Sequence, residues 1–189
     1  MRLRQLRRLV WYIAVRLLVV CIVLSLCVVC FYYAMNLANI QVIVKDGMAA
    51  RAEAVIMSED TEELSKYFFS SFLQTDSVLQ TLSDGSSPYQ NYNVTGIDHR
   101  IDMGFFWTWP WDESVRFEIT ESIPHIDGRV KGSKADEVVA AGGSSAVYPP
   151  SWKSARYRVT LSKEDGQWRI KNLVLIEYVD TDTQETASQ

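Results

Sequence analysis

The chain has 189 residues, of which 48% are hydrophobic, and a formal net charge of -4. The five charged residues before Lys45 are all arginines, whereas all 23 acidic residues and the other 14 basic ones follow from there. All three cysteines precede residue 31, which excludes a disulfide-stapled domain in the rest of the chain.

Arginines dominate the start of the chain. Because the cytoplasmic flanks of membrane spans are enriched in Lys and Arg, they predict a cytoplasmic head at residues 1–8 and a C-terminal part across the membrane. One of them lies at the hydrophobic boundary, where its long side chain can snorkel to lipid headgroups. These residues are Arg2, Arg4, Arg7, Arg8 and Arg16. We expect them to set topology and contact anionic lipid, and we expect no nucleic-acid partner.

The segment Leu17–Met35 contains nineteen residues without a charge. At about 1.5 Å of rise per residue it forms a helix of roughly 28 Å, close to the ~30 Å hydrocarbon thickness of a bilayer. An interfacial extension with Trp11 and Tyr12 precedes it, so we predict a transmembrane helix over residues 9–35. The run is longer than a signal-peptide core and no clean cleavage site follows, which favours an uncleaved, single-pass anchor in the cytoplasmic membrane.

The cysteines, Cys21, Cys27 and Cys30, lie inside this predicted span. Cys27 and Cys30 match a C-x-x-C pattern, but redox and metal sites need polar surroundings and usually more ligands. Within an apolar segment cysteine behaves as a small hydrophobic residue. We therefore predict no metal and no cofactor there.

Helical periodicity continues beyond the predicted span. Apolar residues at helical spacing predict a juxtamembrane helix over residues 36–57, with Gly47 as a candidate hinge or break. A second helix is predicted to start with Asp60 as its N-cap and to keep one apolar face as far as Phe72. A short third helix is predicted at residues 76–82.

From Tyr92 the hydrophobic period changes to two, which is typical of β-strands. Gly96 shifts the phase and predicts a bulge, and Glu164-Asp165-Gly166 predicts a hairpin turn. The alternating segments are 92–103, 105–111, 115–123, 155–161 and 168–178. In the last strand, one face is predicted to carry Trp168, Ile170, Val174, Ile176 and Tyr178, and the other Leu173 and Leu175.

Three remaining stretches lack such periodicity. Residues 124–132 predict a turn and residues 133–150, rich in Gly, Ser and Ala, a loop. The polar end at 180–189 is predicted to be disordered. Helices followed by antiparallel strands predict an α+β fold: one N-terminal transmembrane helix and then a single extracytoplasmic domain, residues 58–179, with N-terminal helices packed on a curved antiparallel sheet.

This pattern resembles the nuclear-transport-factor-two-like, or cystatin-like, fold superfamily. The likeness rests on the helices within 47–82, the strands, and the closing hairpin from Tyr157 to Ile170 with its Gly and Trp. Membrane-anchored bacterial members are most similar in layout, among them the inner-membrane assembly subunits of type IV secretion and conjugation systems. The resemblance implies the fold; the fold itself hosts enzymes, binding modules and scaffolds. The insertion at 133–150 departs from the pattern.

The run from Gly104 to Trp111 is the most unusual local feature. Alternation would place Phe105, Trp107, Trp109 and Trp111 on one face of a strand. That face would pack in the core, bind a protein partner, line a concave pocket for an apolar ligand, or dip into the membrane interface. Pro110 cannot donate to a ladder, which favours an edge strand and so a partner-binding surface.

The sequence offers little support for catalysis. The two histidines, His99 and His125, lack metal-ligand spacing, and no nucleophile or phosphate-binding motif is present. An isomerase-like pocket enzyme would need a buried carboxylate. Residues considered for that role, without a spacing that singles any out, are Asp98, Asp102, Glu118 and Tyr157.

We therefore predict a non-enzymatic, membrane-anchored domain that acts as a structural or assembly component of a bacterial envelope complex. Its expected partners are the lipid bilayer and either itself or other envelope proteins. Anchoring raises the effective concentration of such partners, so weak interfaces suffice. The alternative is a sensor or carrier domain that binds an apolar ligand in a concave aromatic pocket.

Overall fold

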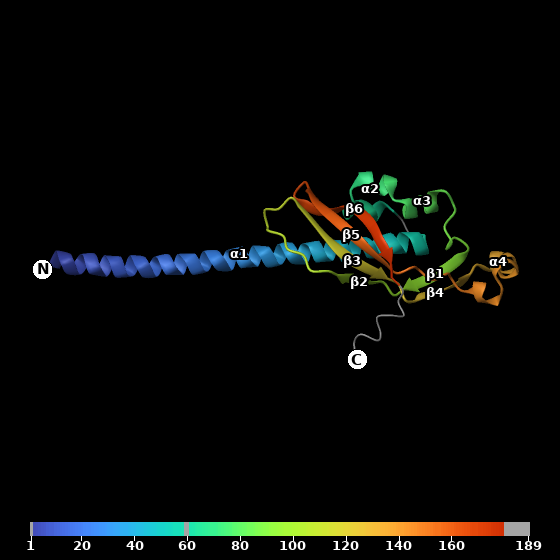
Figure 1. Ribbon diagram of the computed structural model, residues 1–189, viewed down its shortest axis with the longest axis horizontal. Coiled ribbons are helices and arrows are strands. Elements are labelled where there is room, and N and C mark those ends of the chain that lie inside the picture. The colour runs from blue at the N-terminus through green and yellow to red at the C-terminus, as the bar shows by residue number, and fades with distance from the viewer. Residues whose placement is uncertain (1, 59–60, 180–189) are drawn as a thin grey trace, which may run out of the picture.

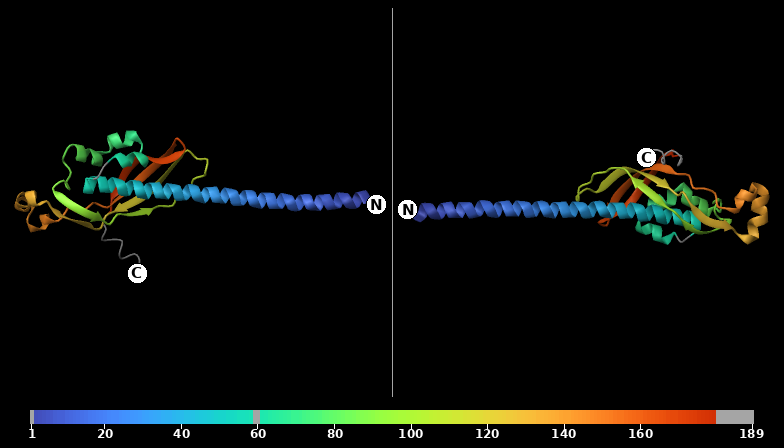
Figure 2. Two further views of the ribbon diagram at one scale, coloured as in Figure 1. Left: turned by 180° about the vertical axis from the view of Figure 1, so that it is seen from behind. Right: turned by 90° about the horizontal axis from the view of Figure 1, so that it is seen from below.

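The computed structural model describes residues 2–58 and 61–179, and the predicted disordered tail lies outside these residues. A single helix, α1 (Arg2–Met57), forms the first third of the chain and projects far beyond the folded domain (Figures 1 and 2). The chain is α+β: a long apolar N-terminal helix is followed by antiparallel sheets and short helices. Its apolar first part has the length and composition of a single membrane span or a signal sequence.

The expected break at Gly47 is absent, because α1 continues through it. Residues 36–57 are also more than a juxtamembrane connector. The side chains of Ile40, Val44 and Met48, spaced one helical turn apart, are fully buried in the main core. The second half of α1 is therefore packed into the core of the folded domain.

The second helix was predicted as one continuous element, but the structure divides it. It contains the 3-10 helix η1 (Glu62–Lys66) and the short helix α2 (Ser70–Thr75). Between them the backbone pairs with the sheet: Phe69 N donates to Ile170 O at 2.9 Å, and Ile170 N donates to Tyr67 O at 2.7 Å. This pairing interrupts the helix. The predicted N-cap, Asp60, lies outside the described residues.

The third predicted helix is confirmed as α3 (Ser77–Ser83). Asp76 is its N-cap, and its carboxylate accepts a hydrogen bond from Val78 N at 3.0 Å.

The strands form two antiparallel sheets. The larger has the order β2 (Arg100–Met103), β3 (Ser114–Ser122), β5 (Ala155–Glu164) and β6 (Gln167–Tyr178), and the smaller pairs β1 (Tyr92–Ile97) with β4 (Ile126–Val130). Residues 92–103 are therefore two strands in different sheets, and the predicted turn at 124–132 contains β4. The bulge at Gly96 is confirmed by a register shift in the β1–β4 pair.

The closing hairpin is confirmed, but the faces of its last strand were partly wrong. Asp165 and Gly166 both have positive φ, as a two-residue hairpin turn requires. Two irregularities in the β5–β6 register change the alternation along β6. As a result Leu173 packs against the core, whereas Val174 is exposed.

The predicted loop at 133–150 contains ordered helical turns. They are η2 (Gly132–Lys134), α4 (Ala135–Gly142) and η3 (Ser144–Val147). The composition of α4 explains the helix. Alanine has the highest helix propensity, and the acidic residues Asp136 and Glu137 in the first turn interact favourably with the helix dipole.

The main core lies between α1 and one face of the larger sheet. Helix residues meet Phe117, Val159 and Ile170 there, while Arg116, Glu118 and Val174 on the other face stay exposed. A second cluster joins the C-terminal end of α1 to β1 and β4 through Ile56, Tyr89 and Ile123. Both cores depend on α1, which positions the remaining surface features.

Candidate functional site

The aromatic run is an irregular loop between β2 and β3, not the predicted strand. Asp112 determines its shape: its carboxylate accepts hydrogen bonds from Trp109 N at 2.7 Å and from the Thr108 hydroxyl at 3.3 Å. The Asp112 N–H in turn donates to Trp109 O at 3.0 Å and closes a turn around Pro110.

The predicted alternation nevertheless survives in this loop. Thr108 and Phe106 point inward with 1% and 9% exposure, and Phe106 stacks on Phe117 with ring centroids 4.0 Å apart. The aromatic residues at the odd positions are instead exposed: Phe105 90%, Trp107 55%, Trp109 40% and Trp111 65%. Core packing is thus excluded for these four residues, and they do not line the interior of the domain.

Three of these side chains form an aromatic cluster with Tyr33 of α1. Ring centroids are 4.7 Å apart for Tyr33 and Trp107, 5.4 Å for Trp107 and Trp109, and 5.0 Å for the stacked pair Trp109 and Trp111. Each distance lies within the range of favourable aromatic pairing. This aromatic cluster consists of Tyr33, Trp107, Trp109 and Trp111.

Asn36 ties this cluster to the domain. Its side-chain oxygen accepts a hydrogen bond from Trp168 Nε1 at 2.8 Å, and its amide nitrogen donates to Trp109 O at 3.5 Å. Lys163, at the β5–β6 hairpin, donates to Pro110 O at 2.9 Å. The loop is therefore held against both α1 and the closing hairpin.

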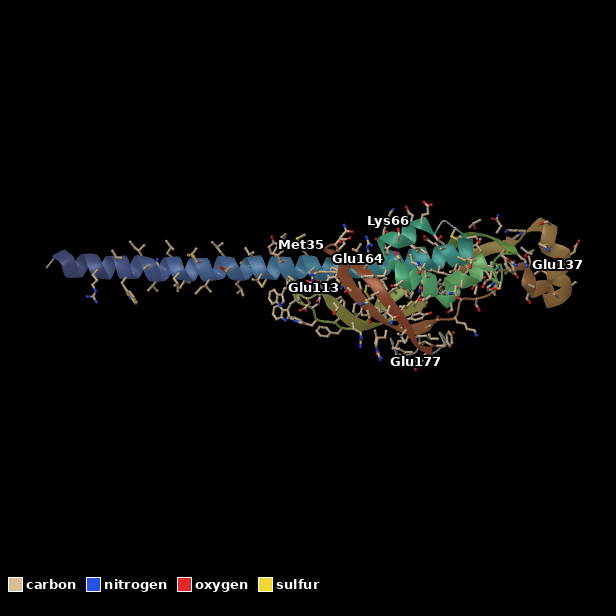
Figure 3. All side chains as sticks on the ribbon, turned by 90° about the horizontal axis from the view of Figure 1, so that it is seen from above. Met35, Lys66, Glu113, Glu137, Glu164 and Glu177 are labelled. Carbon is tan, nitrogen blue, oxygen red and sulfur yellow. The ribbon has the colours of Figure 1, made fainter. Side chains whose placement is uncertain are left out.

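The cluster lies at the end of the domain from which α1 emerges. Figure 3 shows Glu113 and Glu164 beside Met35 at this end, with Glu137 of α4 at the opposite end. Tyr33 is the first residue after the exposed apolar part of α1 that is partly covered by the domain. The aromatic cluster thus begins where the apolar segment ends.

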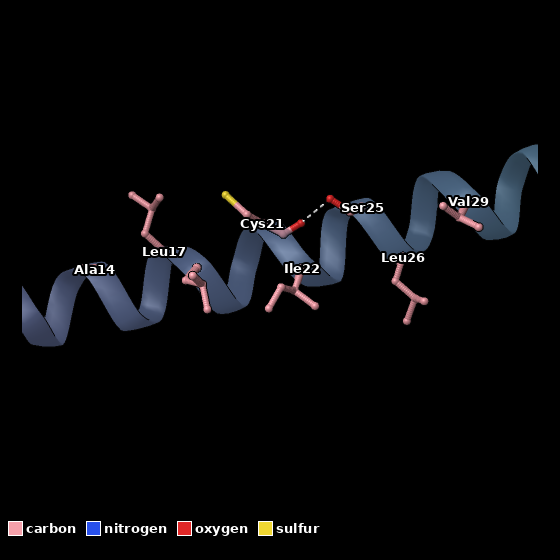
Figure 4. A pocket seen from close by; sticks show the side chains of 8 residues that line it. Ala14, Leu17, Cys21, Ile22, Ser25, Leu26 and Val29 are labelled. Carbon is pink, nitrogen blue, oxygen red and sulfur yellow. Dashed lines mark hydrogen bonds between the residues drawn. The ribbon is translucent and has the colours of Figure 1, made fainter.

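The apolar part of α1 has no protein neighbours within the described chain. A shallow groove along it is lined almost entirely by aliphatic side chains, among them Leu17, Ile22 and Leu26 (Figure 4). The Ser25 hydroxyl donates to Cys21 O within the helix at 2.8 Å, so it needs no external partner. Such a surface suits lipid chains or another apolar helix.

The predicted topology residues are only partly described. Arg7 is exposed, and the Arg16 guanidinium lies 4.7 Å from the centroid of the Tyr12 ring. The side chains of Arg2, Arg4 and Arg8 lie outside the described part of the chain. Cys21, Cys27 and Cys30 are exposed free thiols along the apolar segment.

A second cluster consists of buried charges inside the domain. The Arg51 guanidinium binds the Asp76 carboxylate through two hydrogen bonds of 2.6 and 3.1 Å. Burial alone would lower the pKa of Arg51, but the hydrogen bond and charge of Asp76 outweigh it and raise that pKa. This pair joins α1 to the N-terminus of α3.

Glu121 and His99 form a neighbouring buried pair. Glu121 Oε1 lies 3.0 Å from His99 Nε2, and the Glu121 side chain is fully buried. Burial and the negative charge of Glu121 raise the pKa of the nearby Tyr157 phenol to about 12. Among the described residues, the buried atoms Arg51 Nη1 and Glu121 Oε2 have no hydrogen-bond partner.

The residues considered for catalysis are mostly at the surface. Asp98 pairs with Arg100, which lowers the pKa of the Asp98 carboxyl, and Glu118 pairs with Arg158 across the outer face of the sheet. Asp102 is exposed, and His125 pairs with Asp127 at the surface. Only Tyr157 lies near the buried charges. Within residues 2–58 and 61–179, no three His, Cys, Asp or Glu side chains are grouped to hold a metal ion.

Sequence reasoning missed Glu121, although the signal was present. It occupies the same alternating positions of β3 as Val115, Phe117 and Ile119, so its side chain points inward with theirs. Arg51 likewise shares the helical face of Val44 and Met48. A charged residue at an inward position is itself an indication of a buried pair.

Two grooves on the domain are lined by other residues. One runs along β1 and β4 and includes Asn93, His125 and Tyr148, and another lies between η1, α2 and α3. No protein-family model, curated protein or solved structure matches this chain.

Proposed function

We propose that this chain is an uncleaved single-pass membrane protein whose extracytoplasmic domain serves as a non-enzymatic assembly component of a bacterial envelope complex, in the manner of secretion and conjugation subunits. The observation that carries the proposal is the continuity of α1. The exposed apolar half and the buried half are one uninterrupted helix, so the domain cannot move independently of its anchor.

The buried half of α1 supports retention of the anchor. Ile40, Val44 and Met48 fill the main core from this helix, and Trp168 is hydrogen-bonded to Asn36 near its start. Cleavage close to the apolar segment would free the end of a core helix. An anchor that is also part of the core transmits force and orientation to the domain, which suits a scaffold.

The C-terminal half of β6 supplies a surface for a protein partner. β6 is an edge strand of the larger sheet, and four of its apolar side chains are exposed: Val174, Leu175, Ile176 and Tyr178. An exposed apolar edge strand is a template for pairing with another chain. The partner we propose is a second copy of this chain or another envelope protein.

The alternative of an apolar-ligand carrier receives less support. It required the aromatic run to line a concave pocket, whereas these side chains lie on an exposed loop against α1. The buried charges of Arg51, Asp76, Glu121 and His99 are paired with one another inside the domain, which suits a structural role.

Two tyrosines of nearly equal exposure allow a matched crosslinking test. Tyr178 lies on β6 with 62% exposure, and Tyr148 lines the groove along β1 and β4 with 61%. A photoreactive phenylalanine at either position of the full-length chain, in native membranes, samples its neighbours. We expect protein adducts from position 178 and few from position 148.

The same preparation tests the anchor. Because α1 is proposed to span the bilayer, the chain should remain in the pellet after alkaline carbonate washing and keep its N-terminal segment. Release of the domain into the supernatant would contradict anchoring. A retained chain that gives no protein adduct at position 178 would contradict the assembly role while leaving the anchor intact.

A further inference from the structure

We infer that the loop carrying Phe105, Trp107, Trp109 and Trp111 is a second membrane contact, seated in the outer interface of the same bilayer that α1 crosses. This inference rests on the proposed membrane anchoring of α1. It assigns the exposed aromatic residues to lipid and not to a protein partner, and it adds an orientation of the domain that one helix alone would not fix.

Aromatic residues lie near both ends of the apolar segment of α1. Trp11 and Tyr12 precede it, and Tyr33, which contacts Trp107 and Trp109, lies near its other end. Trp11 and Tyr33 are separated by 22 residues, or roughly 33 Å at 1.5 Å per residue. That is close to the ~30 Å thickness of the hydrocarbon core. The two aromatic groups therefore lie one bilayer thickness apart, as the belts of a membrane protein do.

The chemistry of the exposed side chains also suits a membrane interface. Trp and Tyr favour the headgroup level because their rings are apolar and their N–H and O–H groups are polar. Trp107, Trp109 and Trp111 are 40–65% exposed although their rings contact one another, and Phe105, which lies outside the aromatic cluster, is 90% exposed. In water this would be an unusually costly apolar surface.

Hydrogen bonds hold the loop in place. Asp112 accepts from Trp109 N in the turn at Pro110, Lys163 donates to Pro110 O, and Asn36 of α1 donates to Trp109 O. The loop is thereby fixed beside the emerging helix on one side only. A span with an aromatic loop on one side has a defined rotation about its own axis, so the β6 edge faces a fixed direction above the membrane.

Spin labels on the full-length chain in liposomes test this directly. Cys21, Cys27 and Cys30 are first replaced by Ala, and one new cysteine is introduced in each of three variants. Phe105→Cys samples the loop, Leu24→Cys the span and Ala140→Cys the far end of the domain. All three positions are exposed, so the labels do not disturb the core.

Accessibility to oxygen, which concentrates in hydrocarbon, is compared with accessibility to a water-soluble nickel chelate. We expect the label at 105 to show a higher oxygen-to-nickel ratio than the label at 140 and a lower one than the label at 24. In decreasing order of this ratio, the labels at positions 24, 105 and 140 would lie in hydrocarbon, interface and water.

Each other outcome overturns the inference in a distinguishable way. If the label at 24 is in hydrocarbon but the label at 105 matches the one at 140, the loop is in water and the anchor stands. If the label at 105 is shielded from both reagents, it contacts protein. If the label at 24 is itself in water, the proposed anchoring fails and the inference fails with it.

A loop variant provides an independent readout. Phe105→Ser combined with Trp111→Gln removes two exposed apolar side chains that lie outside the core. We expect the label at 140 to gain mobility relative to the bilayer in this background, because the domain loses its second contact. The matched change Tyr148→Ser, at a similarly exposed aromatic position, should leave that mobility unchanged. Equal mobility in both backgrounds would contradict an orienting role.

Discussion

The two halves of α1 belong to one helix but are built for different surroundings. From Leu17 to Tyr32 apolar side chains lie on every side of the helix and remain exposed. From Asn36 to Asp46 a single apolar stripe faces the core, while Gln41, Lys45 and Asp46 face outward, and from Gly47 to Met57 every residue is at least partly buried. The comparison shows that the pattern of the apolar residues, more than their number, decides whether a helix needs protein or lipid around it.

The arginines of the two halves differ in the same way. Arg16 lies over the Tyr12 ring on the exposed half, where it can reach water or headgroups. Arg51 is buried on the other half and is neutralised by Asp76. On the first half, a long side chain lets the charged group reach water or headgroups. On the second half, a buried charge requires a residue of opposite charge.

The largest expected effect comes from removing that partner. Asp76→Asn keeps a side chain able to cap α3 but leaves the Arg51 guanidinium buried without a counter-charge. We expect the free energy of unfolding to fall by about 3–5 kcal/mol. Denaturant unfolding of the full-length chain in detergent, followed by tryptophan fluorescence, measures it.

The matched control is Asp98→Asn, which breaks an exposed pair with Arg100. Exposed pairs contribute little, so its stability should equal that of the unaltered chain. If the two variants were equally stable, the pairing of Arg51 with Asp76 would not matter to the fold.

The next largest change in the free energy of unfolding is expected from a comparison of two methionines of α1. Met48 is fully buried in the main core, and Met35 is exposed on the apolar half. Met48→Ala creates a cavity and should lower the free energy of unfolding by about 2–5 kcal/mol. Met35→Ala should leave the unfolding of the domain unchanged in the same assay. A similar loss in both variants would show that the halves are not energetically distinct.

These contrasts also explain what the sequence could predict. The apolar segment, the short helix after Asp76, the bulge at Gly96 and the Asp165-Gly166 hairpin are encoded by neighbouring residues, and the structure contains each of them. Local signals of this kind survive because no distant contact competes with them.

The errors arose where a distant contact decides. Pairing with Ile170 interrupts the helix that periodicity predicted across Phe68, and β4 pairs with the distant strand β1, which Gly128 approaches closely. In the aromatic loop the inward and outward positions were right, but Asp112 and Pro110 prevent a ladder. The candidate site itself, a loop against Tyr33, depends on a contact between residues about 75 positions apart, which no local pattern reveals.

A substitution at Gly47 sets a local preference against a distant contact, and its expected effect on stability is the smallest. A glycine inside a helix suggests a hinge, and Gly47→Ala would then stabilise the chain by about 1 kcal/mol through helix propensity. Here a Cβ at position 47 would lie 2.9 Å from Tyr67 Cβ and 3.2 Å from Ile170 Cδ1. Tyr67 is held by its backbone bond to Ile170 and has little freedom to retreat.

Overpacking of this kind typically costs 1–3 kcal/mol, so we expect Gly47→Ala to give a net loss of about 1 kcal/mol. Ala38→Gly, at an exposed position of the same helix, measures the contribution of helix propensity alone to the free energy of unfolding. A more stable Gly47→Ala variant would mean that glycine is merely tolerated there. A less stable one means that glycine lets α1 approach Tyr67 and β6, the contact that makes the anchoring helix part of the domain.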